Sequence, residues 1–120
     1  MTTENETTHK AGDPQPWELK RRDDLAEKVP PHTLDALRKY RDCGYPVGHF
    51  LSAMMANDLR GACNRADDEN APAICDIFRW IYNRMPTAAW GTYEDVIAWV
   101  HDDTQIRTKI MGEHGERWST

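Results

Sequence analysis

Large apolar residues are concentrated in the middle of this chain and recur there with the spacing of α-helices. Over residues 47–66 they fall on one broad face of a helical wheel, whereas polar residues such as Asn64 fall on the opposite face. Residues 72–85 repeat the pattern, and the two segments are separated only by the polar stretch 67–71. Because so short a loop returns the chain alongside itself, the pattern predicts a central helical hairpin.

Further helical segments are predicted on both sides of the hairpin, over residues 17–29, 33–43, 92–100 and 105–111. Thr33 is a candidate N-cap for the second of these segments, and Gly44 is a candidate left-handed residue that closes it. Thr92 and Asp95 resemble a capping box, with Asp in the usual position of Glu. These residues set the expected helix boundaries.

The fold class expected from these segments is all-α, a compact bundle of four to six short helices. Residues 17–111 form the predicted domain, between a polar tail at 1–16 and a frayed tail at 112–120. A chain of 120 residues has the length of one domain. It is also large enough to form a core without metals or disulfides.

Charge gives little support to direct nucleic-acid binding. The chain has 20 acidic and 15 basic residues, for a net charge of −5. Its one tight basic run, Lys20-Arg21-Arg22, is followed at once by Asp23 and Asp24. A protein that binds phosphates needs clustered cations, because each contact releases counterions.

The three cysteines, Cys43, Cys63 and Cys75, form no CxxC pair, which favours a reduced, cytoplasmic protein with free thiols. No apolar run approaches the roughly 20 residues of a membrane helix. A zinc site that combines these thiols with His49 is one reading of the residue types. However, Cys63 and Cys75 fall on or beside apolar helix faces, where a free thiol packs as a small hydrophobe. We therefore expect no metal or cofactor.

Asp58 is the residue that departs from its own pattern. On a continuous helix over 47–66 it lies close to the edge of the apolar face, where a carboxylate needs a partner. Arg65 lies nearly above it, two turns later. Two interpretations stay open. Asp58 is either structural, as a helix cap or in an ion pair with Arg65 or with an arginine of another helix (Arg38 or Arg41), or it belongs to a polar groove that receives a ligand. We find no catalytic motif, phosphate-binding loop or dinucleotide fingerprint in the sequence.

Tryptophans near basic residues are the best candidates for a partner-binding surface. Trp80 lies about 100° from the centre of its helix's apolar face, on the side it shares with Arg84. Trp90 lies in the following turn, and Trp99 flanks the next apolar stripe. Large aromatics beside arginine are common anchors of protein interfaces. The alternative is packing at the rim of the core, with each indole N–H bonded to a carbonyl.

Two segments, GYPVGHFLSAMMANDLRGACNRADDEN and IYNRMPTAAWGTYEDVIAW, carry a resemblance. Over Thr33 to Trp99, slightly more than half of the chain, the sequence resembles a group of small uncharacterised helical proteins encoded by bacteriophages and prophages. The resemblance implies a phage accessory protein that acts in the bacterial cytoplasm. It assigns no catalytic or binding residues.

The function predicted from these observations is that of a non-enzymatic protein that binds a host or phage protein and inhibits or redirects it. One alternative is a nucleic-acid-associated module for phage replication or transcription, using Lys20, Arg21, Arg22, Arg38, Lys39 and Arg41. Another is a small-ligand pocket around Asp58 and Arg65. Homodimerisation also stays open, because amphipathic helices with aromatics at their edges can pair with themselves.

Overall fold

The computed structural model describes residues 25–114, and within this range every regular element is a helix. The elements are α2 (Pro31–Cys43), α3 (His49–Met55), α4 (Leu59–Arg65), η1 (Ala71–Ala73), α5 (Ile74–Arg84), η2 (Thr87–Ala89), α6 (Tyr93–His101) and α7 (Ile106–His114), where η marks a 3₁₀-helix. The predicted all-α class is confirmed. The predicted polar tail at 1–16 lies outside the described residues, as does most of the predicted helix at 17–29. Residues 112–114, predicted to fray, belong to α7.

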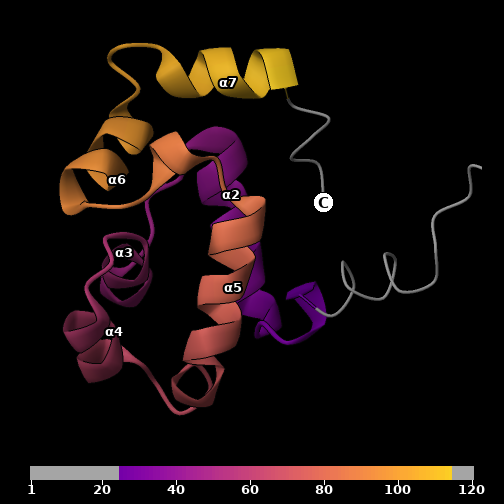
Figure 1. Ribbon diagram of the computed structural model, residues 1–120, viewed down its shortest axis with the longest axis vertical. Helices are drawn as coiled ribbons and strands as arrows, with labels where there is room; N and C mark the ends of the chain where they lie inside the picture. Colours follow the sequence, from indigo (N-terminus) through magenta and orange to yellow (C-terminus); the bar gives the residue numbers. More distant parts are fainter. Residues whose placement is uncertain (1–24, 115–120) are drawn as a thin grey trace, which may run out of the picture.

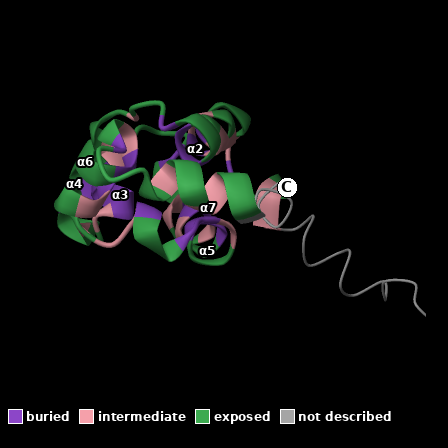
Figure 2. Ribbon diagram, turned by 90° about the horizontal axis from the view of Figure 1, so that it is seen from above, coloured by how far each residue is buried: buried purple, intermediate pink, exposed green. Residues whose placement is uncertain are grey.

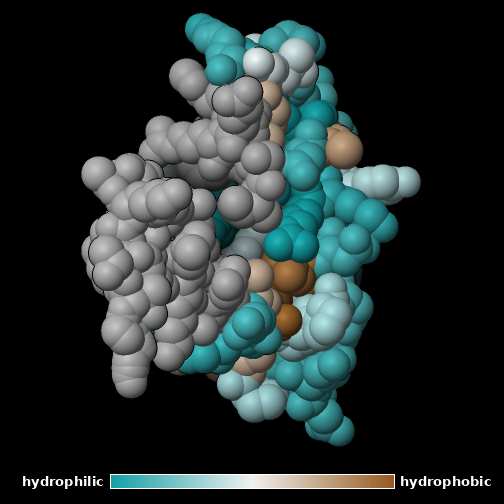
Figure 3. Space-filling model, turned by 90° about the vertical axis from the view of Figure 1, so that its right-hand side faces the viewer, coloured by the Kyte–Doolittle hydropathy of each residue, from teal (hydrophilic) through white to brown (hydrophobic). Residues whose placement is uncertain are grey.

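Helices α2 and α5 run through the middle of the molecule, with α3 and α4 facing α5 from one side (Figure 1). Helix α6 packs on α3, and α7 crosses the end of the molecule next to η2. Seen from above, α7 is exposed or half-buried, and buried residues gather where α2, α3 and α5 meet (Figure 2). Most of the coloured residues on the face shown in Figure 3 are hydrophilic, and the most hydrophobic ones gather in a small area near its middle.

Two aromatic side chains join distant parts of the core by hydrogen bonds. The hydroxyl of Tyr40 in α2 donates to the carbonyl of Ala89 in η2 at 2.6 Å. The indole N–H of Trp99 in α6 donates to the carbonyl of Tyr40 at 2.9 Å. Both side chains are buried, and burial raises the pKa of the Tyr40 phenol above its usual range. These bonds fix α6 against α2.

The predicted continuous helix over 47–66 is wrong, because the chain breaks at residues 56–58 and forms α3 and α4 instead. Asn57 has a left-handed backbone with φ of 62°, a conformation that asparagine tolerates better than most residues. Asp58 then acts as the N-cap of α4, and its carboxylate accepts the backbone N–H of Gly61 at 2.9 Å. The apolar periodicity continues through the break, which is why it did not reveal the break.

The predicted caps have mixed outcomes. Gly44 closes α2 in the left-handed conformation, as predicted. Thr92 caps α6 as predicted, because its hydroxyl oxygen accepts the Asp95 N–H, but the Asp95 carboxylate accepts the Thr92 hydroxyl and not the backbone N–H of a full capping box. The prediction for Thr33 is wrong. Helix α2 begins at Pro31, and the buried Thr33 hydroxyl instead donates to the side chain of Asn70 at 2.6 Å. Thr33 therefore ties α2 to the loop before α5.

No helix among residues 25–114 combines the length and the apolar character that crossing a membrane requires.

Candidate binding groove

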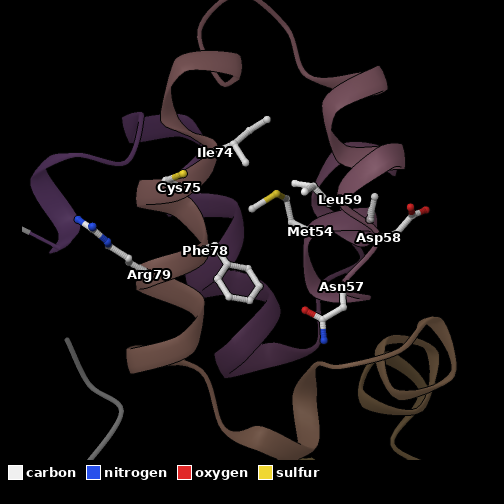
Figure 4. A pocket seen from close by; sticks show the side chains of 9 residues that line it. Met54, Asn57, Asp58, Leu59, Ile74, Cys75, Phe78 and Arg79 are labelled. Carbon is white, nitrogen blue, oxygen red and sulfur yellow. The ribbon is translucent and has the colours of Figure 1, made fainter.

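A cavity of about 490 Å³ opens between the α3–α4 pair and α5 (Figure 4). We call it the α4–α5 groove. Its lining consists of Ala53, Met54, Asn57, Asp58, Leu59, Ile74, Cys75, Phe78 and Arg79. Every lining residue comes from the two segments that the sequence predicted as a helical hairpin. The groove exists because the break at residues 56–58 turns α4 away from the direction of α3.

The interior of the α4–α5 groove is apolar. Met54 and Leu59 point into it from one wall, and Ile74 and Phe78 point into it from the other (Figure 4). Met54 is buried, and Ile74 and Phe78 are half-buried, but Leu59 is 65% exposed. A leucine left in water beside a hollow apolar surface is a feature of binding sites rather than of a closed core.

Polar lining residues lie at the edges of the groove. The side chains of Asp58 and Arg79 point away from the cavity on opposite sides, whereas the amide of Asn57 points into it (Figure 4). The Asn57 amide N–H also makes a long hydrogen bond to the carbonyl of Gly91, at 3.4 Å. The interior therefore offers one neutral polar group among apolar side chains.

An aromatic cluster adjoins the groove at Phe78. The ring of Trp90 packs edge-to-face against Phe78, with centroids 5.6 Å apart, and against Tyr82, with centroids 6.1 Å apart. Tyr82 is 68% exposed. The indole N–H of Trp90 is buried and has no hydrogen-bond acceptor among the described residues. The apolar surface of α5 thus extends beyond the cavity to Tyr82.

The partner of Asp58 is Tyr93, a residue that the sequence pattern did not suggest. The Tyr93 hydroxyl donates to the Asp58 carboxylate at 2.7 Å, across 35 positions of sequence. This bond and the Gly61 N–H hold the pKa of Asp58 below its usual range, and the same bond raises the pKa of Tyr93. Within the described chain, no ion pair joins Asp58 to Arg65. The interpretation of Asp58 as a helix cap is confirmed, because its carboxylate caps α4. The predicted ion pair with Arg65 is wrong, and Arg65 acts on Asp58 only through its charge.

The predicted surface patch of tryptophans is also wrong. Trp80 is 1% exposed and Trp99 is 2% exposed, so neither can meet a partner while the protein is folded. The guanidinium of Arg41 lies over the Trp80 ring, 5.3 Å from its centroid. Arg84 and Trp90 are half-buried, and the ring of Trp90 packs against Phe78 of the groove lining. The alternative of core packing holds for Trp80 and Trp99.

The six cations of the nucleic-acid alternative do not form one described surface. Lys20, Arg21 and Arg22 lie outside the described residues, Arg41 is buried, and Lys39 pairs with Asp35 at 2.9 Å. The described chain also holds no group of three side chains placed to bind a metal. Cys43, Cys63 and Cys75 are free and exposed, so the predicted packing of Cys63 and Cys75 as small hydrophobes is wrong.

Comparison with known proteins identifies no relative of this chain. No protein-family model, curated protein or solved structure matches the chain. The chemical character of the groove therefore follows from its lining residues alone.

The hydrogen bonds of Asp58 predict a pH dependence of stability. Because the folded protein lowers its pKa, ionised Asp58 stabilises the fold at pH values above the ordinary carboxyl pKa of about 4. That contribution is lost as the pH falls through the lower, folded-state pKa. We expect Asp58→Asn, which keeps a capping oxygen but cannot ionise, to flatten the fall in melting temperature below about pH 4.

Asp68→Asn, in the exposed loop before η1, is the matched control and should leave the acid profile of melting temperature unchanged. Part of the acid sensitivity should persist in Asp58→Asn. The reason is Asp102, whose pKa is also lowered, chiefly by the hydroxyl of Thr108. An Asp58→Asn profile parallel to that of the wild type would show that the Asp58–Tyr93 bond contributes nothing in solution.

Proposed function

We propose that this chain is a non-enzymatic binding protein that receives apolar side chains of a protein partner in the α4–α5 groove. The observation that carries the proposal is the exposure of large apolar side chains beside the cavity, 65% for Leu59 and 68% for Tyr82. Exposed apolar surface around a hollow is typical of interaction sites in small proteins. Covering these side chains would remove apolar area from water, and this favours association.

The groove lining favours binding over catalysis. In the described chain the lining includes no histidine, serine or threonine. The carboxylate of Asp58 already accepts hydrogen bonds from Tyr93 and Gly61. Nucleophilic catalysis needs a nucleophile within hydrogen-bond reach of a base. The lining supplies apolar contacts and shape instead.

The resemblance to phage-encoded proteins supplies the biological setting of the proposal. In that setting the partner is a host or phage protein in the bacterial cytoplasm, and binding inhibits or redirects it. The body of the protein suits this role, because the bonds of Tyr40 and Trp99 hold the helices behind the groove in one arrangement. A pre-organised site loses less entropy when a partner binds.

A small apolar ligand is the second candidate, because about 490 Å³ lies within the range of ligand pockets. This candidate differs from the pocket predicted around Asp58 and Arg65, since Asp58 lines the groove but Arg65 does not. A ligand confined to the cavity would leave the exposed side chain of Tyr82 in water. The protein partner is therefore the better-supported occupant.

The test compares capture of partners from nuclease-treated bacterial lysate by three forms of the tagged protein: wild type, Leu59→Glu and Ile97→Glu. Leu59 and Ile97 are both mostly exposed, at 65% and 57%, so both variants should melt near the wild-type temperature. Leu59→Glu places a charge at the groove, and we expect it to reduce the amount of captured partner by about tenfold or more. Ile97→Glu, on α6, should capture normally. Equal capture by all three forms would contradict the proposal.

A further inference from the structure

Helix α5 carries two apolar faces, and only one belongs to the core. Ile77, Trp80 and Ile81 are buried. A second row, formed by Ile74, Phe78 and Tyr82 at four-residue intervals, is half-buried at its start and exposed at its end. The eight residue steps from Ile74 to Tyr82 rise about 12 Å along the helix, or roughly two turns. We call this second row the α5 ridge.

The α5 ridge has the form of a surface that packs against another helix. Rows of side chains at four-residue spacing fit between the corresponding rows of a neighbouring helix, and this is the commonest class of helix packing. Met54 and Leu59 provide the facing wall (Figure 4). Both walls of the groove are helices, whose backbone groups bond within the helix, so no strand edge is offered to an extended peptide. The geometry suits a helix of about two turns.

The charges on α4 and α5 indicate which charge the sides of such a helix should carry. Helices α4 and α5 together contain four arginines, against one aspartate within α5 and the capping Asp58. The walls are therefore net positive in a chain whose net charge is −5. Within the described residues, Arg60, Arg65 and Arg79 make no ion pair. Asp58, the one acidic group of the lining, is already held by Tyr93 and Gly61.

We propose that the occupant of the α4–α5 groove is an amphipathic helix of the partner, with apolar residues at i, i+4 and i+7 and acidic residues on its flanks. The apolar residues enter between the α5 ridge and the wall of Met54 and Leu59, and the acidic flanks lie outside the cavity, along the sides of α4 and α5 that carry the arginines. Long-range attraction between the flanks and the arginines raises the association rate, and apolar contact holds the complex. This inference rests on the proposed function and names the class of partner.

The test uses three synthetic peptides of about 15 residues, a length at which isolated helices are only marginally stable in water. The first has leucines at i, i+4 and i+7 with glutamates on the flanks. The second has lysines in place of the glutamates, and the third has serines in place of the leucines. Fluorescence anisotropy measures the binding of each labelled peptide to the full-length protein at low and moderate salt.

We expect the glutamate-flanked peptide to bind about tenfold or more tightly than the lysine-flanked peptide at low salt, with a smaller difference at higher salt. Arg79→Glu should reduce that preference while leaving the melting temperature unchanged, because Arg79 is exposed. Leu59→Glu should abolish binding, and Ile97→Glu should leave it intact. The serine peptide should not bind, because it has no apolar anchors.

Equal affinity for both charged peptides, tighter binding of the lysine-flanked peptide, or binding of the serine peptide would each overturn the inference. Failure of all three peptides to bind would overturn it too. A fall in the bound fraction of the glutamate-flanked peptide as the protein concentration rises would assign the groove to a second copy of this chain instead. If the peptides fail while Leu59→Glu still loses the captured partner, the proposed function stands and only the class of partner is wrong. If Leu59→Glu captures normally, the groove itself is not the binding site.

Discussion

Trp80→Ala is expected to lower the free energy of unfolding by about 3–5 kcal/mol, the range for removing a buried tryptophan. Trp80 is 1% exposed and is among the largest fully buried side chains of the described chain. Its removal leaves a cavity between α2 and α5 and takes away the ring beneath the Arg41 guanidinium. Single domains are stable by only about 5–15 kcal/mol, so a large fraction of the stability is at stake. Urea denaturation followed by far-ultraviolet circular dichroism measures the loss.

The control for Trp80→Ala is Trp90→Phe. Trp90 is half-buried, and its indole N–H lacks an acceptor among the described residues, so phenylalanine removes no hydrogen bond there. Phenylalanine is smaller than tryptophan but keeps an aromatic ring at this half-buried site, so we expect a loss within about 1.5 kcal/mol, well below that of Trp80→Ala. If Trp80→Ala kept the wild-type denaturation midpoint, Trp80 would not be a core residue. The partner-binding role predicted from the sequence would then be the better interpretation.

Arg41→Ala is the second substitution with a large expected effect, a loss of about 3 kcal/mol or more. Arg41 is 1% exposed, its Nε donates to Asp42 at 2.8 Å, and its Nη1 donates to the carbonyl of Arg84 at 3.3 Å. The guanidinium also lies over Trp80. Truncation therefore leaves a carbonyl and an aromatic face without their partner in a space closed to water. The measurement is the urea denaturation midpoint.

Two further variants are compared with Arg41→Ala: the conservative substitution Arg41→Lys and the control Lys39→Ala. Lysine keeps the charge but lacks the planar guanidinium that stacks and bonds in two directions, so we expect it to recover only part of the stability. Lys39 neighbours Arg41 but is exposed and pairs only with Asp35 on its own helix, so Lys39→Ala should stay close to the wild-type midpoint. Equal midpoints for Arg41→Ala and Lys39→Ala would contradict the buried role of Arg41.

The parts of the fold that depend on neighbouring residues were predictable from the sequence. Gly44 closes α2 and Thr92 caps α6, because a left-handed glycine and a capping hydroxyl act over a few residues. The helix break at Asn57 was missed, although asparagine followed by aspartate is itself a cap signal. The apolar repeat continued on both sides of the break and dominated the prediction.

The groove depended on contacts that no local pattern contains. Trp80 is buried beneath the guanidinium of Arg41, a charged residue that would ordinarily be expected at the surface. The partner of Asp58 is 35 positions away in sequence. Leu59 lies on the apolar face of the predicted helix, yet it is exposed because α4 begins a new direction at that residue. The hairpin predicted the two walls of the groove, but only the structure shows the space between them.

The most direct test of the groove as a binding surface is the alkylation rate of Cys75 in the isolated protein and in its captured complex, measured by mass spectrometry. Cys75 lines the groove and is exposed, and Cys43, at the end of α2, is equally free and serves as the internal reference. If the partner occupies the groove, alkylation of Cys75 slows in the complex and alkylation of Cys43 is unchanged. Unchanged alkylation of Cys75 in the complex, or protection of Cys43 alone, would contradict the proposal.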